Sequence, residues 1–243
     1  KQRGMNVTVL HLMDRIMERQ LDGRASRMLR QSIEEKGINI ITEANTEALI
    51  GKDGHVNQVR LKDGTVLDAD LVVFAVGIRP NITLAQSAGL RCNRGILVND
   101  TMQTFDPSIY AVGECIEHRN QTFGLVEPLW GQAFICATHL AEHGSLTFKS
   151  PTVPTQLKVS GVDVFSAGNF EPKEDYEDII LNDEKRQIYK RIIIQKDKVI
   201  GAVLFGDTED GMWYAELIAD QTPISTFRNK LLFGKDFAMK KAG

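Results

Sequence analysis

One short segment combines the residue types that bind a polar ligand at the end of a strand. Residues 108–113 read as a strand that runs into Gly113, and Glu114 follows directly. Glycine lets a ligand approach the backbone, and a carboxylate accepts hydrogen bonds from vicinal hydroxyl groups. In open α/β sheets, ligands bind beyond the carboxyl ends of the strands. The segment therefore predicts a site for a hydroxyl-bearing ligand. The alternative is a tight turn at Gly113 followed by a solvated acid.

A second candidate lies at the start of a predicted helix. An amphipathic helix is expected from Pro128 to Gly144, with the proline near its first position, and Val126 and Glu127 come directly before it. The N-terminus of a helix offers unpaired N–H groups and partial positive charge, which favour negative charge on a ligand. The alternative for Glu127 is an ordinary acid in the N-cap region.

Two other sets of residues are weighed as reactive groups. His139 and His143 fit the H-x-x-E-H pattern, in which two histidines hold zinc and the glutamate activates water for peptide hydrolysis. The competing interpretation is that they stabilise the last turn of the helix, since the sequence offers no distinct third ligand. Cys92, Cys115 and Cys136 read as small buried residues. No metal ligand and no catalytic residue is therefore assigned.

The elements that must position these residues follow an α/β pattern in the first part of the chain. Residues 7–12 read as a buried parallel strand, an amphipathic helix is expected between Asp22 and Lys36, and residues 38–42 form a second strand. Such a unit has a right-handed crossover. The other elements predicted before residue 150 are an antiparallel meander around Asp53-Gly54 and Asp63-Gly64, a buried strand at 71–76, a short helix ending at Gly89, and strands at 95–98 and 108–113.

Beyond an expected linker at residues 151–154 the pattern changes to one strand after another. These strands are predicted at residues 156–161, 162–168, 177–182, 187–196 and 199–205, and helices at about 208–220 and 225–232 close the chain. The fold class predicted from these patterns is α/β with a C-terminal α+β domain.

Composition excludes several classes of function. The 243 residues include 29 basic and 32 acidic ones, and the net charge of -3 provides no general positive field for nucleic acid or anionic lipid. The longest apolar run, residues 71–76, is far shorter than the roughly twenty residues that cross a bilayer. Three widely spaced cysteines fit no disulfide framework, which favours the reducing cytoplasm. Residues 1–4 read like the end of a helix, so we expect further sequence before them.

Residues 104–115, together with 74–81, resemble the FAD-dependent pyridine nucleotide disulfide oxidoreductase superfamily. Four more segments are similar to the large subunits of the assimilatory NAD(P)H nitrite reductases, in the C-terminal part of their flavin reductase module. These segments are residues 77–80, 123–126, 188–191 and 201–207. The similarity covers nearly the whole chain.

This resemblance implies incomplete Rossmann-like lobes that bind FAD and NAD(P). Residues 1–79 would be the C-terminal part of an NAD(P)-binding domain, residues 80–149 the C-terminal part of an FAD-binding domain, and residues 150–243 a β-rich interface domain. The superfamily also has two G-x-G-x-x-G turns, which the sequence lacks, so both are expected before Lys1.

The resemblance also implies roles for the candidate residues. Gly113 and Glu114 would bind the ribityl chain of FAD, residues 126–128 would lie near the flavin pyrimidine, and Gly77 would line the nicotinamide cleft. Electrons would pass from NAD(P)H through FAD to a downstream redox centre or carrier protein. Siroheme and an iron-sulfur cluster outside this chain would then reduce nitrite to ammonium.

The end of the first predicted strand departs from the common NAD-binding pattern. An acidic residue commonly accepts hydrogen bonds from the adenosine ribose there, but this chain has His11. An imidazole does not copy the paired acceptance of a carboxylate, and with Arg15 nearby it can accommodate a 2′-phosphate, which favours NADPH. The alternative is a polar strand end without specificity.

Two other functions stay open at this point. One is a stand-alone reductase of rubredoxin or ferredoxin, which shares the same motifs. The other is a non-catalytic interaction fragment in which the C-terminal strands form the face of a homodimer. The isolated fragment is not assumed to be active.

Overall fold

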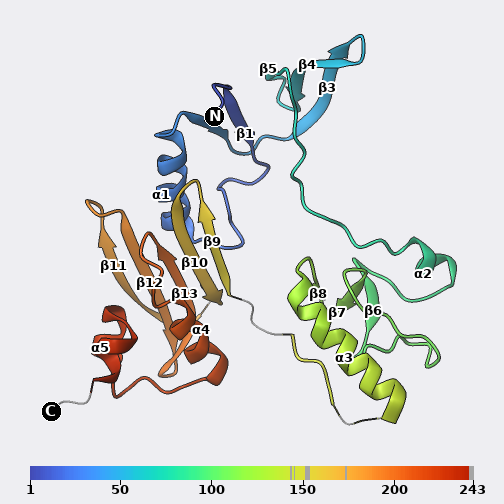
Figure 1. Ribbon diagram of the computed structural model, residues 1–243, viewed down its shortest axis with the longest axis vertical. Helices are drawn as coiled ribbons and strands as arrows, with labels where there is room; N and C mark the ends of the chain where they lie inside the picture. Colours follow the sequence, from blue (N-terminus) through green and yellow to red (C-terminus); the bar gives the residue numbers. More distant parts are fainter. Residues whose placement is uncertain (143, 145, 151–153, 173, 241–243) are drawn as a thin grey trace. The chain divides into compact units, whose positions relative to one another are not determined.

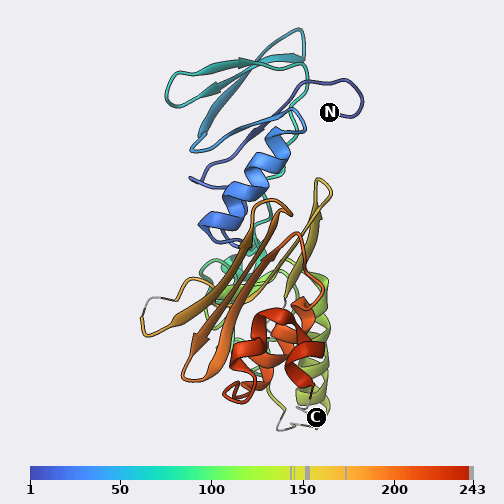
Figure 2. The ribbon, with the colours of Figure 1, turned by 90° about the vertical axis from the view of Figure 1, so that its left-hand side faces the viewer.

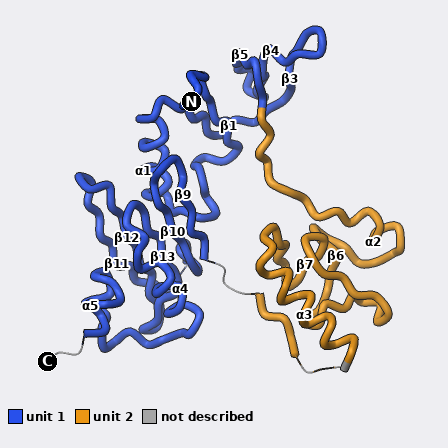
Figure 3. The backbone as a smooth tube through the Cα atoms, viewed as in Figure 1, with its two compact units in different colours: residues 1–72, 152–243 blue, residues 73–151 orange. Residues whose placement is uncertain are grey.

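The computed structural model describes residues 1–142, 144, 146–150, 154–172 and 174–240. Its contacts divide the chain into two compact units, shown in Figure 3. The first unit joins Lys1–Val72 with Thr152–Gly243, and the second unit is Val73–Pro151. The three predicted domains, with boundaries at residues 79 and 149, stay a prediction.

The first unit begins with the predicted strand-helix-strand pattern. Strand β1 (Val7–Leu10) pairs in parallel with β2 (Ile38–Ile41), and helix α1 (Gly23–Glu34) connects them. Asp22 is the N-cap of α1, and its Oδ1 accepts a hydrogen bond from the Ala25 N–H at 2.9 Å. The prediction that β1 is buried is wrong, because its two middle residues are exposed.

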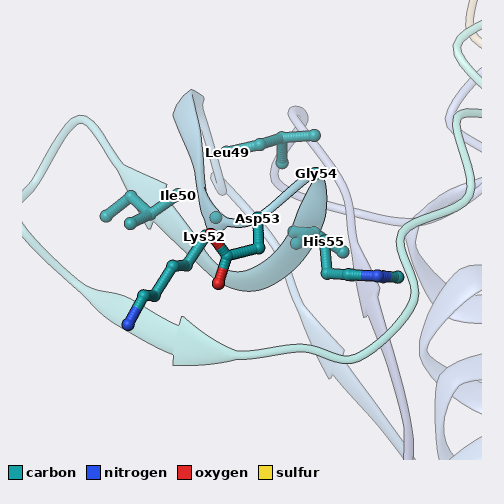
Figure 4. A pocket seen from close by; sticks show the side chains of 8 residues that line it. Leu49, Ile50, Lys52, Asp53, Gly54 and His55 are labelled. Atoms are coloured by element: carbon teal, nitrogen blue, oxygen red, sulfur yellow. The ribbon is translucent and has the colours of Figure 1, made fainter.

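An antiparallel meander follows, as the two Asp-Gly turns predict. Its strands are β3 (Thr46–Lys52), β4 (His55–Leu61) and β5 (Val66–Asp68), paired in sequence order. Residues 49–56 line a shallow hollow around the β3–β4 turn, seen in Figure 4. None of the candidate binding residues lies in this hollow.

The C-terminal part of the first unit is a five-stranded antiparallel sheet with the strand order β11-β12-β13-β10-β9 (Figure 1). Its strands confirm the predicted pattern: β9 (Thr155–Val159), β10 (Val162–Gly168), β11 (Glu177–Asp183), β12 (Ile188–Gln195) and β13 (Lys198–Phe205). The helices after the sheet are α4 (Gly211–Asp220), the short 3-10 helix η1 (Arg228–Phe233) and α5 (Lys235–Met239).

Alternating side chains give this sheet two apolar faces. Ala202 and Leu204 pack in a cluster with the C-terminal helices, which lie against one face in Figure 2. Val203 and Phe205 point to the opposite face and pack in a cluster with the apolar side of α1. The sheet is therefore buried on both faces, and one of these faces packs against α1 of the N-terminal strand-helix-strand unit.

The second unit is a smaller α/β structure. Strand β6 (Ile96–Val98) pairs in parallel with β7 (Ile116–His118), and β8 (Gln121–Thr122) pairs with β7 in the antiparallel sense. The helices are α2 (Thr83–Ser87) and α3 (Val126–Glu142). Helix α3 begins two residues earlier than predicted, so Pro128 is its third residue.

Two predicted strands are wrong. Residues 71–76 form no strand, and Val73, Phe74 and Val76 are largely exposed. Residues 108–113 form no strand either and contribute only an isolated bridge from Tyr110 to Gln103. A strand needs a neighbour that accepts and donates its backbone hydrogen bonds along its length. The described residues provide none for residues 71–76 and only two for residues 108–113, from the Thr104 N–H to the Ile109 carbonyl and from the Ala111 N–H to the Met102 carbonyl. The α/β fold class with a C-terminal α+β domain is confirmed.

No helix among the described residues is long and apolar enough to cross a membrane.

Candidate functional site

The sequence predicted that the Gly113-Glu114 turn follows a strand. In the structure no strand directly precedes this turn, which leads into β7. Gly113 has φ +102°, a backbone conformation that residues with a Cβ rarely adopt. Glu114 is exposed. Its carboxylate therefore stands free to accept hydrogen bonds from a ligand at the point where the chain enters the parallel pair β6–β7.

Gln132 of α3 holds this turn in place. Its side chain is completely buried, and its Oε1 accepts a hydrogen bond from the Gly113 N–H at 2.8 Å. The Nε2 of the same amide is buried and has no partner among the described residues. A buried amide donor without a partner costs free energy unless a ligand or water accepts its hydrogen bond.

Sequence reasoning did not find Gln132. The signal was present, because Gln132 lies at helical spacing between Leu129 and Ile135, which both pack into the core of the second unit. A polar residue on the apolar face of an amphipathic helix indicates a buried hydrogen bond. Its partner, the backbone of a turn 19 residues earlier, could not be read from the sequence.

The N-terminus of α3 lies on the same helix as Gln132. Val126 and Glu127 are exposed, whereas Pro128 is buried. Pro128 has no N–H, so the free donors of this first turn come from its neighbours. Val126, Trp130 and Phe134, spaced four residues apart, form an exposed apolar stripe along α3.

The segment that contains Gly77 lies beside the start of α3. Gly77 has φ +77°, and a Cβ built on Gly124 would lie 3.5 Å from Cδ1 of the adjacent Ile78. Gly77, the Gly113-Glu114 turn and α3 all belong to the second unit, in which Gln132 of α3 bonds directly to the turn.

His11 and Arg15 belong to the first unit, and both already contact an acid. His11 follows β1, and its Nε2 lies 3.1 Å from Oε2 of Glu18. Arg15 donates from Nη2 to Oε1 of Glu171 at 2.6 Å. Sequence reasoning missed both acids, because Glu18 is seven residues from His11 and Glu171 is far along the chain.

The remaining candidate reactive groups are two histidines and three cysteines. His139 Nδ1 lies 2.9 Å from the Tyr110 hydroxyl, whereas His143 lies outside the described residues. The described part of the chain holds no group of three or more potential metal ligands. The three cysteines carry free thiols, and the prediction that they are buried is wrong, because each is only partly buried. Desolvation still raises the pKa of Cys92 and Cys136, which makes these two poor nucleophiles.

Two family models match this chain. Residues 1–133 match the model of the pyridine nucleotide-disulphide oxidoreductases, and residues 154–222 match the rubredoxin NAD+ reductase C-terminal domain.

Curated relatives and solved structures are also similar. The nitrite reductase [NAD(P)H] of Bacillus subtilis is 48% identical over 91% of this chain and 28% of its own length. The assimilatory nitrate reductase electron transfer subunit of the same organism is 40% identical over 94% of this chain and 30% of its own length. An FAD-dependent pyridine nucleotide-disulphide oxidoreductase from Desulfovibrio vulgaris superposes with a TM-score of 0.76 at 27% identity, over 95% of this chain and 62% of that structure. The chain spans less than a third of the length of the two curated relatives.

Proposed function

Because the chain belongs to the pyridine nucleotide-disulphide oxidoreductase family, we propose that it is part of an FAD-dependent NAD(P)H oxidoreductase. In the whole protein, NAD(P)H would be the electron donor, FAD the carrier and a downstream redox group the acceptor. The similarity to a nitrite reductase over most of the chain supports the reduction of nitrite to ammonium as the overall reaction. The siroheme and iron-sulfur cluster of that reaction would lie outside this chain.

The observation that carries this proposal is the turn at Gly113 and Glu114, together with the buried amide behind it. The residues present fit a flavin dinucleotide in three respects. The Glu114 carboxylate is exposed, the Gln132 Nε2 lacks an acceptor among the described residues, and α3 begins with exposed apolar side chains. A polyol chain, an amide acceptor and an aromatic ring system are the complementary chemical groups.

Each residue has a separate task in this proposal. Glu114 accepts hydrogen bonds from two hydroxyls of the ribityl chain, and Gln132 keeps the turn in the conformation that presents this carboxylate. The first turn of α3, at Val126, Glu127 and Pro128, directs its partial positive charge towards the pyrimidine edge of the flavin. Bound FAD supplies the chemistry of accepting a hydride and passing electrons onward. Gly77, His11 and Arg15 remain proposed contacts of the nucleotide.

A second candidate function has its own support. Residues 154–222 match a domain described from rubredoxin NAD+ reductase, which favours a small electron-carrier protein as the acceptor. A non-catalytic interaction fragment that forms a homodimer is the remaining alternative. A cytoplasmic location stays a prediction.

Anaerobic reduction tests the proposal. The purified protein is supplied with FAD and mixed with NADH or NADPH, and we expect the absorbance of the bound flavin to bleach. Adding nitrite or oxidised rubredoxin to the reduced protein then separates the two acceptors. A protein that binds no flavin, oxidises neither nucleotide and still forms a dimer would contradict the proposal and support the interaction fragment.

A further inference from the structure

We propose that the strand-end site around His11 takes NADH in preference to NADPH, and that Glu18 sets this preference. This inference rests on the proposed function, since it concerns the nucleotide that the oxidoreductase uses. Its basis is a contact that the sequence did not reveal, between the histidine at the strand end and a nearby acid.

His11 is fixed at the carboxyl edge of the β1–β2 pair. Its backbone N–H donates to the Ile41 carbonyl at 2.9 Å, which extends the parallel ladder by one hydrogen bond. At this edge of a nucleotide-binding sheet the adenosine ribose is recognised. The side chain of His11 is therefore placed where a ribose or a 2′-phosphate would be distinguished.

Glu18 restores a carboxylate at this position. Its Oε2 lies 3.1 Å from the His11 ring, and its side chain keeps 24% of its surface exposed, so it stays accessible to a ligand. The ribose of NADH offers two hydroxyl donors, which a carboxylate accepts. The 2′-phosphate of NADPH offers only acceptors and negative charge, which the same carboxylate repels.

Arg15 is also committed to an acid. Its bond to Glu171, which lies in the loop after β10, is short at 2.6 Å, whereas its Nε is buried and has no hydrogen-bond partner among the described residues. Binding a 2′-phosphate would require Arg15 to leave Glu171 or to share its charge with it. Arg19 lies 3.9 Å from Glu18, but its side chain is 86% exposed and adds little to the local field. His11 and Arg15, the two residues that the sequence associated with NADPH, thus each contact a carboxylate.

Direct binding of the two nucleotides to the protein tests the inference without any turnover. The dissociation constants of NADH and NADPH are measured by titration, followed through nicotinamide fluorescence. We expect NADH to bind about tenfold more tightly, because the 2′-phosphate of NADPH meets an unfavourable charge at a partly exposed and therefore solvent-screened site. Glu18→Gln removes that charge and is expected to bring the two dissociation constants to within about threefold of each other.

Asp14→Asn is the matched control, because it makes the same change of charge at an exposed residue of the same loop. It should leave the ratio of the two dissociation constants as it is in the wild type. Equal or tighter binding of NADPH by the wild type would overturn the inference and leave the proposed function intact, and so would an unchanged ratio in Glu18→Gln. Binding of neither nucleotide would overturn both.

Discussion

Asp22 makes three hydrogen bonds from a side chain that is almost completely buried. Its Oδ1 caps helix α1, and its Oδ2 accepts from the Tyr189 hydroxyl at 2.7 Å and from Arg191 at 3.2 Å. Burial and the neighbouring carboxylate raise the pKa of Tyr189, so its hydroxyl stays protonated and donates. One residue therefore ties the start of α1 to strand β12.

Replacing Asp22 should destabilise the protein strongly. Asp22→Ala removes the helix cap and leaves the largely buried Arg191 with Asp178 as its one remaining acid among those described. We expect a loss of about 3 kcal/mol in the free energy of unfolding, because the change removes a helix cap and two hydrogen bonds to a buried carboxylate, one of them from a charged group. Denaturation with urea measures this loss.

Tyr189→Phe is the graded control for this prediction. It removes one hydrogen bond from the same cluster and should cost only about 1 kcal/mol. If Asp22→Ala unfolds at the same urea concentration as Tyr189→Phe, the cluster does not hold α1 against the sheet.

At the scale of elements, Asp100 joins the loop after β6 to the end of β7. Its carboxylate accepts from Arg119 at 2.9 and 2.6 Å and contacts His118 Nε2 at 2.8 Å. Arg119 first and His118 second lower the pKa of Asp100 to about 2. Its backbone carbonyl accepts from the Phe148 N–H at 2.8 Å, so the same residue also anchors the segment after α3.

This lowered pKa predicts how stability changes in acid. The folded state holds Asp100 ionised more strongly than the unfolded state does, where the pKa is near 3.8. Its contribution is therefore complete above about pH 4 and is lost as the pH falls through about 2. Between these values, we expect the urea midpoint of Asp100→Asn to fall less steeply than that of the wild type. Parallel curves for the two proteins would contradict the role of Asp100.

The sequence was informative about elements whose contacts are local. The meander and the strands of the five-stranded sheet were predictable because tight turns join most neighbouring strands, which pair with each other along most of their length. The pairing of β10 with β13, which completes the five-stranded sheet, was not predicted. The strand predictions for residues 71–76 and 108–113 were wrong because an apolar run is typical of a strand but does not show which strand pairs with it. The periodicity of a sequence predicts which side of an element is buried, but it does not predict which other element pairs with it.

The same limit applies to the candidate site. Gly113 and Glu114 could be found because a glycine and an acid follow an apolar run, and this pattern is local in the sequence. Gln132 and Glu18 were missed because each acts through a residue that the fold brings to it. The role of a residue that acts through such a contact can be identified only when the structure is known.

At the scale of the whole molecule, the proposed tasks are divided between the two units. The first unit carries His11, Arg15 and Glu18, which are proposed to bind the adenosine end of the nucleotide, and the second carries Gly77 together with the residues proposed to hold the flavin. Each set can be tested by itself, since a change to Glu18 should alter nucleotide binding and a change to Glu114 should alter flavin binding. We therefore expect two separable losses, one of nucleotide binding and one of flavin binding.

The dissociation constant of FAD tests the central claim most directly. We expect Glu114→Gln and Gln132→Leu each to weaken FAD binding by about 10- to 100-fold, because each removes a hydrogen bond or the support of one at the ribityl site. The exposed Glu209, remote in sequence and in the first unit, gives the control variant Glu209→Gln, which should bind FAD as the wild type does. Wild-type affinity for FAD in both Glu114→Gln and Gln132→Leu would contradict the claim that this turn holds the flavin.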